Sequence, residues 1–488
     1  MTRRDFLRAS ALSGAGLVIA FYVPRAARAA PPAPKKPPPA PNAFVRIAPD
    51  ESVTVLLAHS EMGQGIWTGL AMLIAEELEC DWSKVRVEHA PAAPAYAHTA
   101  FGMQMTGGST STWSEFDRYR TVGAMARDML VRAAAQRWKA DPLRLRAEHG
   151  FVHRGKAKLS YGQLAEAAAA LRPPAAVKLK EAKDWKLIGK PVRRLDSPEK
   201  ITGKAQFGMD VRFPGLRTAV VARAPVFGGK VTSFDAGQAK AMPGVEQVVQ
   251  VPSGVAVVAR DFWSAKTARE ALQIEWELGP GAAVDSDELE ASYRAMARTP
   301  GAVAVEKGDC DGVLSSAARR VEAEYAVPYL AHATMEPLNC TVKLDGDRCE
   351  IWTGTQFQTN DQAAAARIAG LPPQNVSIHT MFLGGGFGRR ATPQSDFVSE
   401  AVHVAKAAGV PVKVVWTRED DMRGGYYRPM FVHRIEAGLD AGGLPVAWKH
   451  TIVGQSILAG TPFEKMMVKN GIDETSVEGA ADSPYLDA

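Results

Sequence analysis

The chain has 488 residues, of which 46% are hydrophobic and 23% are charged, and this length and composition are ordinary for a globular protein of about three domains. The formal net charge is +5, but five arginines and one aspartate give the first 29 residues +4, which leaves +1 for the rest. Charge therefore gives no support for a nucleic-acid partner.

The N-terminus has the pattern of an export signal. Arg3 and Arg4 precede an apolar run over 9–23, and Ala27-Arg-Ala29 follows as a small-residue cleavage site. We predict a twin-arginine signal peptide over 1–29 and a periplasmic location. A membrane anchor is the alternative, but the run is short for a spanning helix, and no later stretch is long and apolar enough to be one. Residues 30–42 contain seven prolines and predict an extended linker.

The four cysteines are Cys80, Cys310, Cys340 and Cys349. They are scattered and form no Cys-x-x-Cys pair, so we expect neither a zinc nor an iron–sulfur site in this chain. Turns centred on residues 345–347 do not place Cys340 opposite Cys349, which argues against a bridge.

Hydrophobic periodicity divides the remainder into three regions. The first, 43–180, has predicted strands at 52–57 and 85–89 and helices at 66–79 and 113–138. Serines and threonines in the loop 106–112 are expected to cap the second helix, and a helix start of this kind also binds anions. The second, 185–278, has strands at 219–223, 245–250, 254–260 and 273–277 and a helix at 262–272, and is predicted to be a compact α+β module.

The third region, 285–488, follows a linker at 279–284. We predict helices at 286–298, 360–370 and 395–408, strands at 320–327, 375–381 and 412–416, a hairpin at 339–352, a polar loop at 418–429 and paired strands at 433–440 and 444–453. The mixture of elements predicts an α+β fold class.

A glycine-rich turn lies between the strand at 375–381 and the helix at 395–408. It reads Gly384-Gly-Gly-Phe-Gly-Arg-Arg390. Backbone N–H groups in such a turn form an anion concavity, and the two arginines add charge suited to phosphate. A glycine-rich surface loop is the competing interpretation. The turn lacks the Lys-Ser/Thr of a Walker loop and fits a dinucleotide fingerprint poorly.

Five motifs in this order resemble the large subunit of molybdenum hydroxylases, the xanthine dehydrogenase and aldehyde oxidase family. They are Glu61-Met-Gly-Gln-Gly65, Gly107-Gly-Ser-Thr-Ser111, His332-Ala-Thr-Met-Glu-Pro337, Thr355-Gln356 and Gly384-Gly-Gly-Phe-Gly388. The early position of the first motif is similar to the exported bacterial branch that includes isoquinoline 1-oxidoreductase. The resemblance implies a molybdopterin-binding domain, incomplete at its C-terminus, with an inserted α/β hammerhead domain at 185–278.

The resemblance also implies a molybdenum cofactor, in bacteria usually molybdopterin cytosine dinucleotide, with no protein ligand to the metal. Gln356 and Phe387 are then the catalytic residues, with Gln356 facing the oxo ligand and Arg434 lining the substrate pocket. The implied cofactor-binding set is Gln64, Gly65, Ser109, Ser111, Gln356, Gly385, Gly386, Phe387, Gly388 and Arg389. The competing interpretations are helix caps for Gln64, Ser109 and Ser111, a strand-edge cation for Arg434 and a satisfied core histidine for His332, which we favour.

The implied reaction hydroxylates an electron-poor carbon with water as the oxygen source, using a glutamate as general base. The family's Gly-x-Gly-Glu motif is not found before Ala488, so the chain resembles a truncated large subunit. Ala391 stands where purine-oxidising members carry glutamate, which favours an N-heterocycle or an aldehyde as substrate. A small iron–sulfur partner subunit and an electron acceptor are implied, and we expect no turnover by this chain alone. A non-catalytic fragment that binds cofactor or partner is the alternative.

Overall fold

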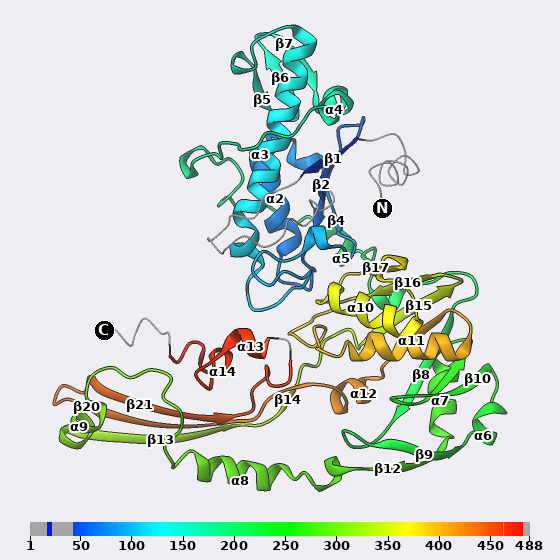
Figure 1. Cartoon of the computed structure of the whole chain (residues 1–488), viewed down its shortest axis with the longest axis vertical. Coiled ribbons are helices and arrows are strands. Elements are labelled where there is room, and N and C mark those ends of the chain that lie inside the picture. Colours follow the sequence, from blue (N-terminus) through cyan, green and yellow to red (C-terminus); the bar gives the residue numbers. More distant parts are fainter. Residues whose placement is uncertain (1–16, 22–41, 462, 482–488) are drawn as a thin grey trace, which may run out of the picture.

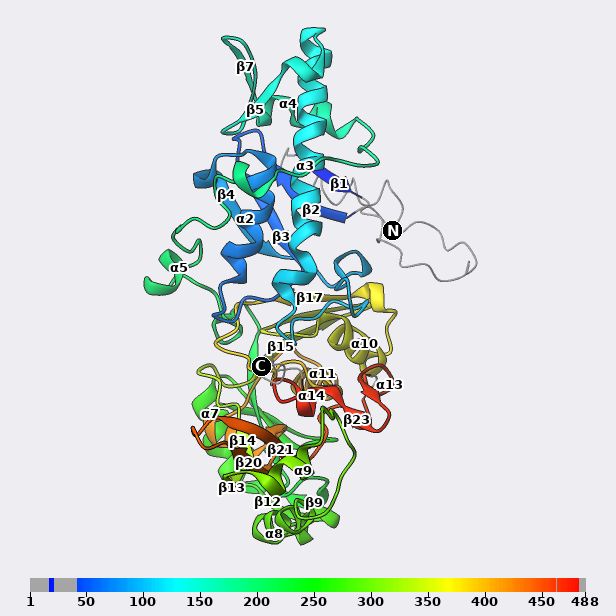
Figure 2. The ribbon, with the colours of Figure 1, turned by 90° about the vertical axis from the view of Figure 1, so that its left-hand side faces the viewer.

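The computed structural model describes residues 17–21, 42–461 and 463–481, so most of the predicted leader and linker lies outside the described residues. The described chain is elongated (Figure 1). The N-terminal region with its long helix forms one end, and the seven-stranded sheet and the long three-stranded sheet lie beside each other in the other half, which the turned view also shows (Figure 2). Strands and helices alternate without a repeating βα unit, which confirms the α+β class.

The N-terminal region packs two helices on a four-stranded sheet of order β1-β2-β3-β4. The strands are β1 (Leu17–Phe21), β2 (Asn42–Ile47), β3 (Val53–Leu57) and β4 (Val85–His89). Only the β3–β4 pair is parallel, and α2 (Ile66–Leu78) makes its crossover. The apolar stripe of α2 packs against the long α3 (Ser111–Trp138), and both helices share one core with the sheet.

A small sheet extends this region. It contains β5 (Arg146–Glu148), β6 (Phe151–Arg154) and β7 (Ala157–Ser160), followed by α4 (Tyr161–Ala169). Ser160 and Gln163 form a capping box that starts α4. These elements were not predicted from the sequence, because strands of three or four residues give too little periodicity to recognise.

The central sheet has the order β10-β11-β8-β18-β15-β16-β17, with β8–β18 and β16–β17 parallel. The strands are β8 (Arg217–Arg223), β10 (Val245–Val251), β11 (Gly254–Ala259), β15 (Asn339–Asp345), β16 (Arg348–Thr353), β17 (Val376–Thr380) and β18 (Val412–Val415). The helices α10 (Gln358–Ala369) and α11 (Asp396–Ala408) share one apolar core with it, while α6 (Gly237–Lys240) and α7 (Phe262–Glu270) pack against alternate residues of β8 and β11.

This sheet changes one expectation. Residues 185–278 were predicted to be a compact module, but β8 pairs with β18, so the module's strands continue into a sheet built by residues 339–415. Within the module β9 (Lys230–Asp235) pairs only with β12 (Gln273–Glu277). The pairing could not be predicted, because no local sequence pattern indicates which distant strand completes a sheet.

The three-stranded sheet has the order β13-β20-β21 and carries two helices. Its elements are β13 (Arg319–Val327), β20 (Phe431–Leu439), β21 (Pro445–Gly454), α8 (Ser286–Met296) and α9 (Cys310–Ser316). The predicted polar loop 418–429 instead begins as α12 (Arg418–Arg423), and the Thr417–Asp420 capping box was its signal.

The remaining elements are short. They are α5 (Ser197–Ile201), β14 (Leu330–Ala331), β19 (Tyr427–Arg428), α13 (Glu464–Met467), β22 (Val468–Lys469), β23 (Ile472–Asp473) and α14 (Glu474–Val477). Single 3-10 turns span Trp82–Lys84, Pro94–Tyr96, Pro142–Arg144, Ala182–Asp184, Gly208–Asp210, Pro280–Ala283 and Pro373–Asn375. Within the described ranges, no helix combines the length and the apolarity needed to cross a membrane.

Candidate cofactor site

Four of the predicted motif segments meet where the N-terminal region joins the central sheet. Each motif together with its flanking residues forms a segment, and the segments are 59–65, 104–111, 354–358 and 382–391. Ser60 links three of them, because its N–H donates to Thr106 Oγ1 (2.8 Å) and its Oγ donates to the carbonyl of Thr355 (2.7 Å). The Leu383 N–H donates to the Glu61 carbonyl (3.1 Å) and brings in the glycine-rich turn. Segments as far apart in sequence as Glu61 and Leu383 thus form one cluster.

Gln356 stands at the centre of this cluster and is 3% exposed. Its Nε2 donates to the carbonyl of Thr106 (2.9 Å), and its Oε1 accepts the N–H of Gly388 (3.2 Å). The Gln356 backbone bonds the same two segments. Its N–H donates to the Arg390 carbonyl (3.0 Å), and its carbonyl accepts the Thr106 N–H (2.7 Å). The carboxamide has one Nε2 hydrogen beyond these bonds, and its orientation is fixed from both sides.

The glycines of the turn 384–388 serve different purposes. A Cβ on Gly384 would lie 2.2 Å from Glu336 Cβ, and one on Gly386 would lie 2.6 Å from Gln356 Oε1, so both positions are needed for close packing within the protein. Gly388 differs: its φ is +95° and a Cβ there would meet no atom within 4 Å. Phe387, also at positive φ (55°), is 71% exposed. The Phe387–Gly388 side of the turn is therefore the open one.

The arginines of the turn are not placed as the sequence suggested. Arg389 and Arg390 are 2% and 1% exposed. Arg389 forms a two-pronged ion pair with Asp396 (2.7 and 3.1 Å), and Arg390 bonds Glu336 and three backbone carbonyls of the turn's surroundings. The prediction that they offer charge to phosphate is corrected: their partners arrive from elsewhere in the chain and neutralise them. They hold the turn in shape.

Glu61 occupies the start of α2. Its buried carboxylate accepts the N–H groups of Gly63 (2.9 Å), Gly65 (3.3 Å) and Trp67 (2.9 Å). Gly65, at φ +91°, is the N-cap. Gln64 does not cap the helix; its amide closes the turn by bonding the Ser60 carbonyl (2.8 Å) and the Met62 N–H (2.8 Å). The α2 terminus is thus already satisfied by a carboxylate of the protein.

The start of α3 is arranged differently. Thr110 is the N-cap but makes no side-chain capping bond; its Oγ1 donates to the Gly107 carbonyl (2.8 Å) and lies 2.7 Å from His98 Nε2. Ser111 Oγ lies 3.0 Å from His59 Nδ1, and Ser109 is exposed at φ 53°. The predicted caps are therefore absent, because histidines engage two of the hydroxyls. In the part of the chain that the structure describes, the first N–H groups of α3 have no side-chain acceptor.

Two histidines near the cluster differ from what was expected. His332 is partly buried, its Nδ1 finds no hydrogen-bond partner among the described residues, and burial lowers its pKa. His89, at the end of β4, was not predicted as a site residue but contacts the cluster. Its Nδ1 donates to the Thr380 carbonyl (2.9 Å), and its Nε2 accepts the Glu61 N–H (3.1 Å). Burial lowers the His89 pKa to about 4, which matches this neutral tautomer.

Arg434 is not brought into the cluster. It lies on β20, where it forms ion pairs with Glu322 (2.7 Å) and Glu436 (2.6 Å) across and along the three-stranded sheet. These contacts correspond to the alternative reading of Arg434 as a strand cation. A role in lining the substrate pocket finds no support in them.

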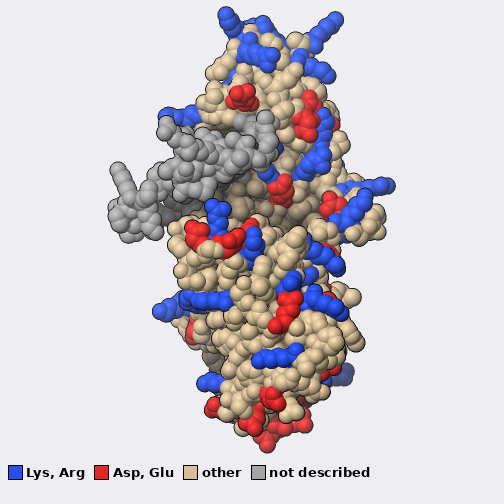
Figure 3. All heavy atoms as spheres, turned by 90° about the vertical axis from the view of Figure 1, so that its right-hand side faces the viewer, with Lys and Arg blue, Asp and Glu red and all other residues tan. Residues whose placement is uncertain are grey.

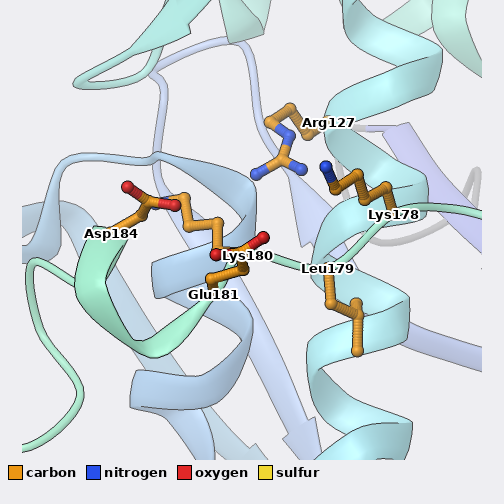
Figure 4. A pocket seen from close by; sticks show the side chains of 6 residues that line it. All are labelled: Arg127, Lys178, Leu179, Lys180, Glu181 and Asp184. Atoms are coloured by element: carbon orange, nitrogen blue, oxygen red, sulfur yellow. The ribbon is translucent and has the colours of Figure 1, made fainter.

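Two hollows lie outside the cluster centre. The larger, about 280 Å³, is lined by Arg127, Lys178, Leu179, Lys180, Glu181 and Asp184. Its Arg127 and Lys178 side chains point toward one another (Figure 4). At 1.5 Å per residue, Arg127 lies roughly 24 Å along α3 from Ser111, so this hollow is remote from the cluster. The smaller, about 130 Å³, borders the cluster through Phe357, Asn360 and Pro393 and is mainly apolar. On the face shown in Figure 3, basic side chains are scattered among acidic ones and form no single patch.

A buried carboxylate lies beneath the Gln356 segment. Asp361 is 2% exposed, accepts a hydrogen bond from Thr355 Oγ1, and its N–H bonds the Phe357 carbonyl (3.0 Å). Thr355 Oγ1 in turn accepts the Phe357 N–H (2.9 Å), so Asp361 braces the segment from below. Burial raises the pKa of Asp361 to about 7.

The Asp361 pKa makes a prediction about stability. Because the folded pKa is above the unfolded value of 3.8, the folded state is penalised progressively as pH rises from 3.8 to about 7, and fully above it. We expect Asp361→Asn to match the parent near pH 4 and to be more stable at pH 8 by on the order of 4 kcal/mol. Thermal unfolding across pH 4–8 measures this. Asp345→Asn, in an exposed hairpin turn, is the matched control, and an Asp361→Asn gain that does not vary with pH would contradict the assignment.

The cluster fits an acceptor-rich ligand. Its open surfaces are backbone: the Phe387–Gly388 side of the turn, Gly63, where a Cβ would meet nothing within 4 Å, and the first turn of α3. Pterin and pyrophosphate groups need free N–H donors and room for close approach. The start of α3 offers the donors, whereas Gly63 and Gly388, whose own N–H groups bond Glu61 and Gln356, offer the room. The residues present therefore suit a molybdopterin dinucleotide.

Comparison with known proteins also indicates a molybdopterin-binding chain. Two family models, both described as molybdopterin cofactor-binding domain, match residues 295–474 and 3–211. The isoquinoline 1-oxidoreductase subunit beta of Brevundimonas diminuta is 33% identical over 467 residues, covering 86% of this chain and 60% of that protein. The membrane-bound aldehyde dehydrogenase [pyrroloquinoline-quinone] of Gluconacetobacter polyoxogenes is 30% identical over 506 residues, covering 96% and 64%.

Among solved structures, quinoline 2-oxidoreductase from Pseudomonas putida 86 aligns with a TM-score of 0.44 and 21% identity over 54% of this chain and 39% of that one. The chain spans less than two thirds of the length of the two curated relatives. The two domain matches and the identity over most of the chain establish that it belongs to the molybdenum hydroxylase family, as a molybdopterin cofactor-binding member.

Proposed function

We propose that this chain is the cofactor-binding part of an exported oxidoreductase that hydroxylates an electron-poor carbon of an N-heterocycle or an aldehyde, with water as the oxygen source. The observation that carries the proposal is the position of Gln356, fixed between the Thr106 carbonyl and the Gly388 N–H at the point where four motif segments meet. A carboxamide held in this way offers its remaining N–H at one defined position.

The cofactor we propose is molybdopterin cytosine dinucleotide, which supplies the oxygen-transfer and redox chemistry when it is bound. The chain's part is to bind and orient it. Gln356 and the turn at Phe387–Gly388 would face the metal end. The open backbone of Gly63 to Gly65, whose N–H groups bond Glu61, would lie against the pterin, and the Ser109–Ser111 start of α3 would hold phosphate groups. Arg389 acts indirectly, because its ion pair with Asp396 fixes the turn.

The substrate class follows from the relatives and from one residue. The names of two relatives specify isoquinoline and aldehyde oxidation. Ala391, partly buried after the two arginines, provides no carboxylate for recognition of a purine. We therefore infer an electron-poor N-heterocycle or an aldehyde as the substrate, with a separate electron acceptor.

Electrons would leave through a small iron–sulfur subunit. The four thiols of this chain are free and lie apart: Cys340 faces Val414 across the β15–β18 pair, while Cys349 faces Leu344 across the hairpin. Burial raises the pKa of Cys80 to about 12 and of Cys349 to about 11, which opposes the thiolate form that binds clusters. We therefore place the iron–sulfur clusters in a partner subunit and not on the thiols of this chain.

Gly388 tests cofactor binding directly. Gly388→Ala adds a methyl group on the open side of the turn, and we expect it to lower the molybdenum content of the purified chain severalfold. Gly443→Ala is the matched control, because Gly443 also has positive φ (+85°) and open space but lies in the β20–β21 turn. Both substitutions carry a similar backbone strain, of about 1–3 kcal/mol. Equal molybdenum per chain in the two variants, by elemental analysis, would count against the site.

Export is tested through the leader, which lies outside the described residues apart from β1. Replacing Arg3 and Arg4 by lysine is expected to keep the protein in the cytoplasm, because the twin-arginine pair is the feature that the export pathway reads. Cell fractionation with an antibody against the folded chain measures this. An unchanged periplasmic yield would refute the export proposal.

A further inference from the structure

Two buried histidines lie side by side behind the start of α3. The His59 and His98 side chains are both 1% exposed, and their rings meet edge to face with centroids 5.4 Å apart. His59 precedes the Glu61 motif and His98 lies in the loop before the Gly107 motif. Each histidine contacts a different hydroxyl of the α3 start: His59 contacts Ser111, and His98 contacts Thr110.

The hydrogen bonds fix the state of His98. Its Nδ1 accepts the N–H groups of Ala100 (3.0 Å) and Phe101 (3.3 Å), so its proton is on Nε2 and points at Thr110 Oγ1 (2.7 Å). Thr110 then donates onward to the Gly107 carbonyl. Burial lowers the His98 pKa to about 4, which agrees with a permanently neutral ring. His98 is thus part of a closed chain of bonds with no remaining donor.

His59 is not closed in the same way. Its Nδ1 lies 3.0 Å from Ser111 Oγ, while its buried Nε2 has no hydrogen-bond partner among the described residues and lies 3.5 Å from Glu115 Oε1. Although burial raises the pKa of Glu115, the His59 contact and the Arg118 charge lower it overall, so the carboxylate is ionised. Arg118 bonds the Glu115 carboxylate (3.2 Å) and also donates to the carbonyls of Ala95 (2.7 Å) and Ala97 (2.9 Å).

An ionised Glu115 favours a proton on His59 Nε2 and so orients the ring with Nδ1 toward Ser111. The Ser111 hydroxyl, on the first helical residue, then donates to Nδ1, and this bond anchors the start of α3 to His59. Because the N-cap Thr110 bonds the Gly107 carbonyl and not the helix, the first N–H groups of α3 are left for an external acceptor. The start of α2 offers no such opening, because Glu61 already occupies it. His59 therefore connects the buried carboxylate of Glu115 to the first residue of the 28-residue helix α3.

We propose that His59 is a positioning residue: through its bond to Ser111 it holds the first turn of α3 in the place where its free N–H groups meet a phosphate group of the dinucleotide. This inference rests on the proposed cofactor function and adds a residue that its motifs do not contain. It predicts that His59 acts through Nδ1, whereas the Nε2–Glu115 contact only aligns the ring.

Two variants separate the nitrogens. His59→Asn keeps a polar atom near the Nδ1 position and is expected to retain most of the cofactor. His59→Gln places its amide near Nε2, loses the Ser111 contact, and is expected to reduce bound molybdenum and released nucleotide severalfold. Ser111→Ala is expected to cause the same loss, and the Ser111→Ala/His59→Gln double variant no more than either, because contacting residues that act through one bond are not additive. His450→Gln, on β21, controls for loss of a histidine.

The measurement is molybdenum and nucleotide per full chain after expression in a host that makes the cofactor, with the unfolding midpoint taken on each sample. A loss in His59→Gln and Ser111→Ala with retention in His59→Asn supports the inference. Equal loading of parent and His59→Gln refutes it and leaves the proposed function standing, as does a loss that only follows the unfolding midpoint. A parent chain without molybdenum refutes both the function and the inference.

Discussion

Replacing Arg390 by methionine is expected to cost about 3–5 kcal/mol of folding free energy, as found when one partner of a buried ion pair is removed. The Arg390 side chain is fully buried and donates to the carbonyls of Gly385 (2.9 Å), Gly354 (3.3 Å) and Glu336 (2.8 Å), as well as to the Glu336 carboxylate (3.2 Å). Methionine fills the space but removes all four bonds. The Glu336 carbonyl and carboxylate keep Thr334 and Gly384 as donors, while the carbonyls of Gly354 and Gly385 lose the arginine as donor.

Denaturant unfolding followed by fluorescence measures this loss. Arg434→Met, which removes a cation from ion pairs at the three-stranded sheet, is the matched control and should cost much less. If the two variants lose the same stability, Arg390 does not hold the glycine-rich turn, and the description of the turn as a braced scaffold is wrong.

Gln356→Met should abolish most of the turnover in an enzyme assembled with its partner subunit. The substitution preserves the length of the side chain but removes its hydrogen bonds to the Thr106 carbonyl and the Gly388 N–H, together with the remaining side-chain N–H. Removing one positioned donor from an active site typically costs roughly a hundredfold in rate or more. The assay would follow an artificial electron acceptor with isoquinoline and with an aldehyde.

Gln358→Met is the control for this variant. Gln358 is also buried (1% exposed) and bonds Ser60 Oγ (2.8 Å), but its side chain does not contact the glycine-rich turn. We expect a comparable loss of stability and a much smaller loss of turnover. Similar turnover in the two variants would remove Gln356 from the catalytic centre.

Local sequence patterns located the elements and the motif loops. The predicted strands at 85–89 and 273–277 coincide with β4 and β12, and the glycine-rich turn lies between β17 and α11 as expected. These predictions succeeded because periodicity and glycine placement act within a few residues.

The state of the side chains could not be predicted in the same way. Arg390 was expected to face phosphate, yet its carboxylate partner Glu336 is 54 positions away, and Ser111 was expected to cap α3, yet His59 reaches it from 52 positions away. In both cases a distant residue takes the hydrogen-bonding capacity that the local pattern had assigned to a ligand or a cap. The pairing of β8 with β18 was missed for the same reason.

The most direct test of the account is the molybdenum and nucleotide content of the purified chain, expressed in a host that makes the cofactor. We predict molybdenum in near-equimolar amount to the chain, cytidine monophosphate released from it on acid hydrolysis, and loss of both in Gly388→Ala but not in Gly443→Ala. A folded chain that contains neither molybdenum nor cytidine nucleotide would contradict the account.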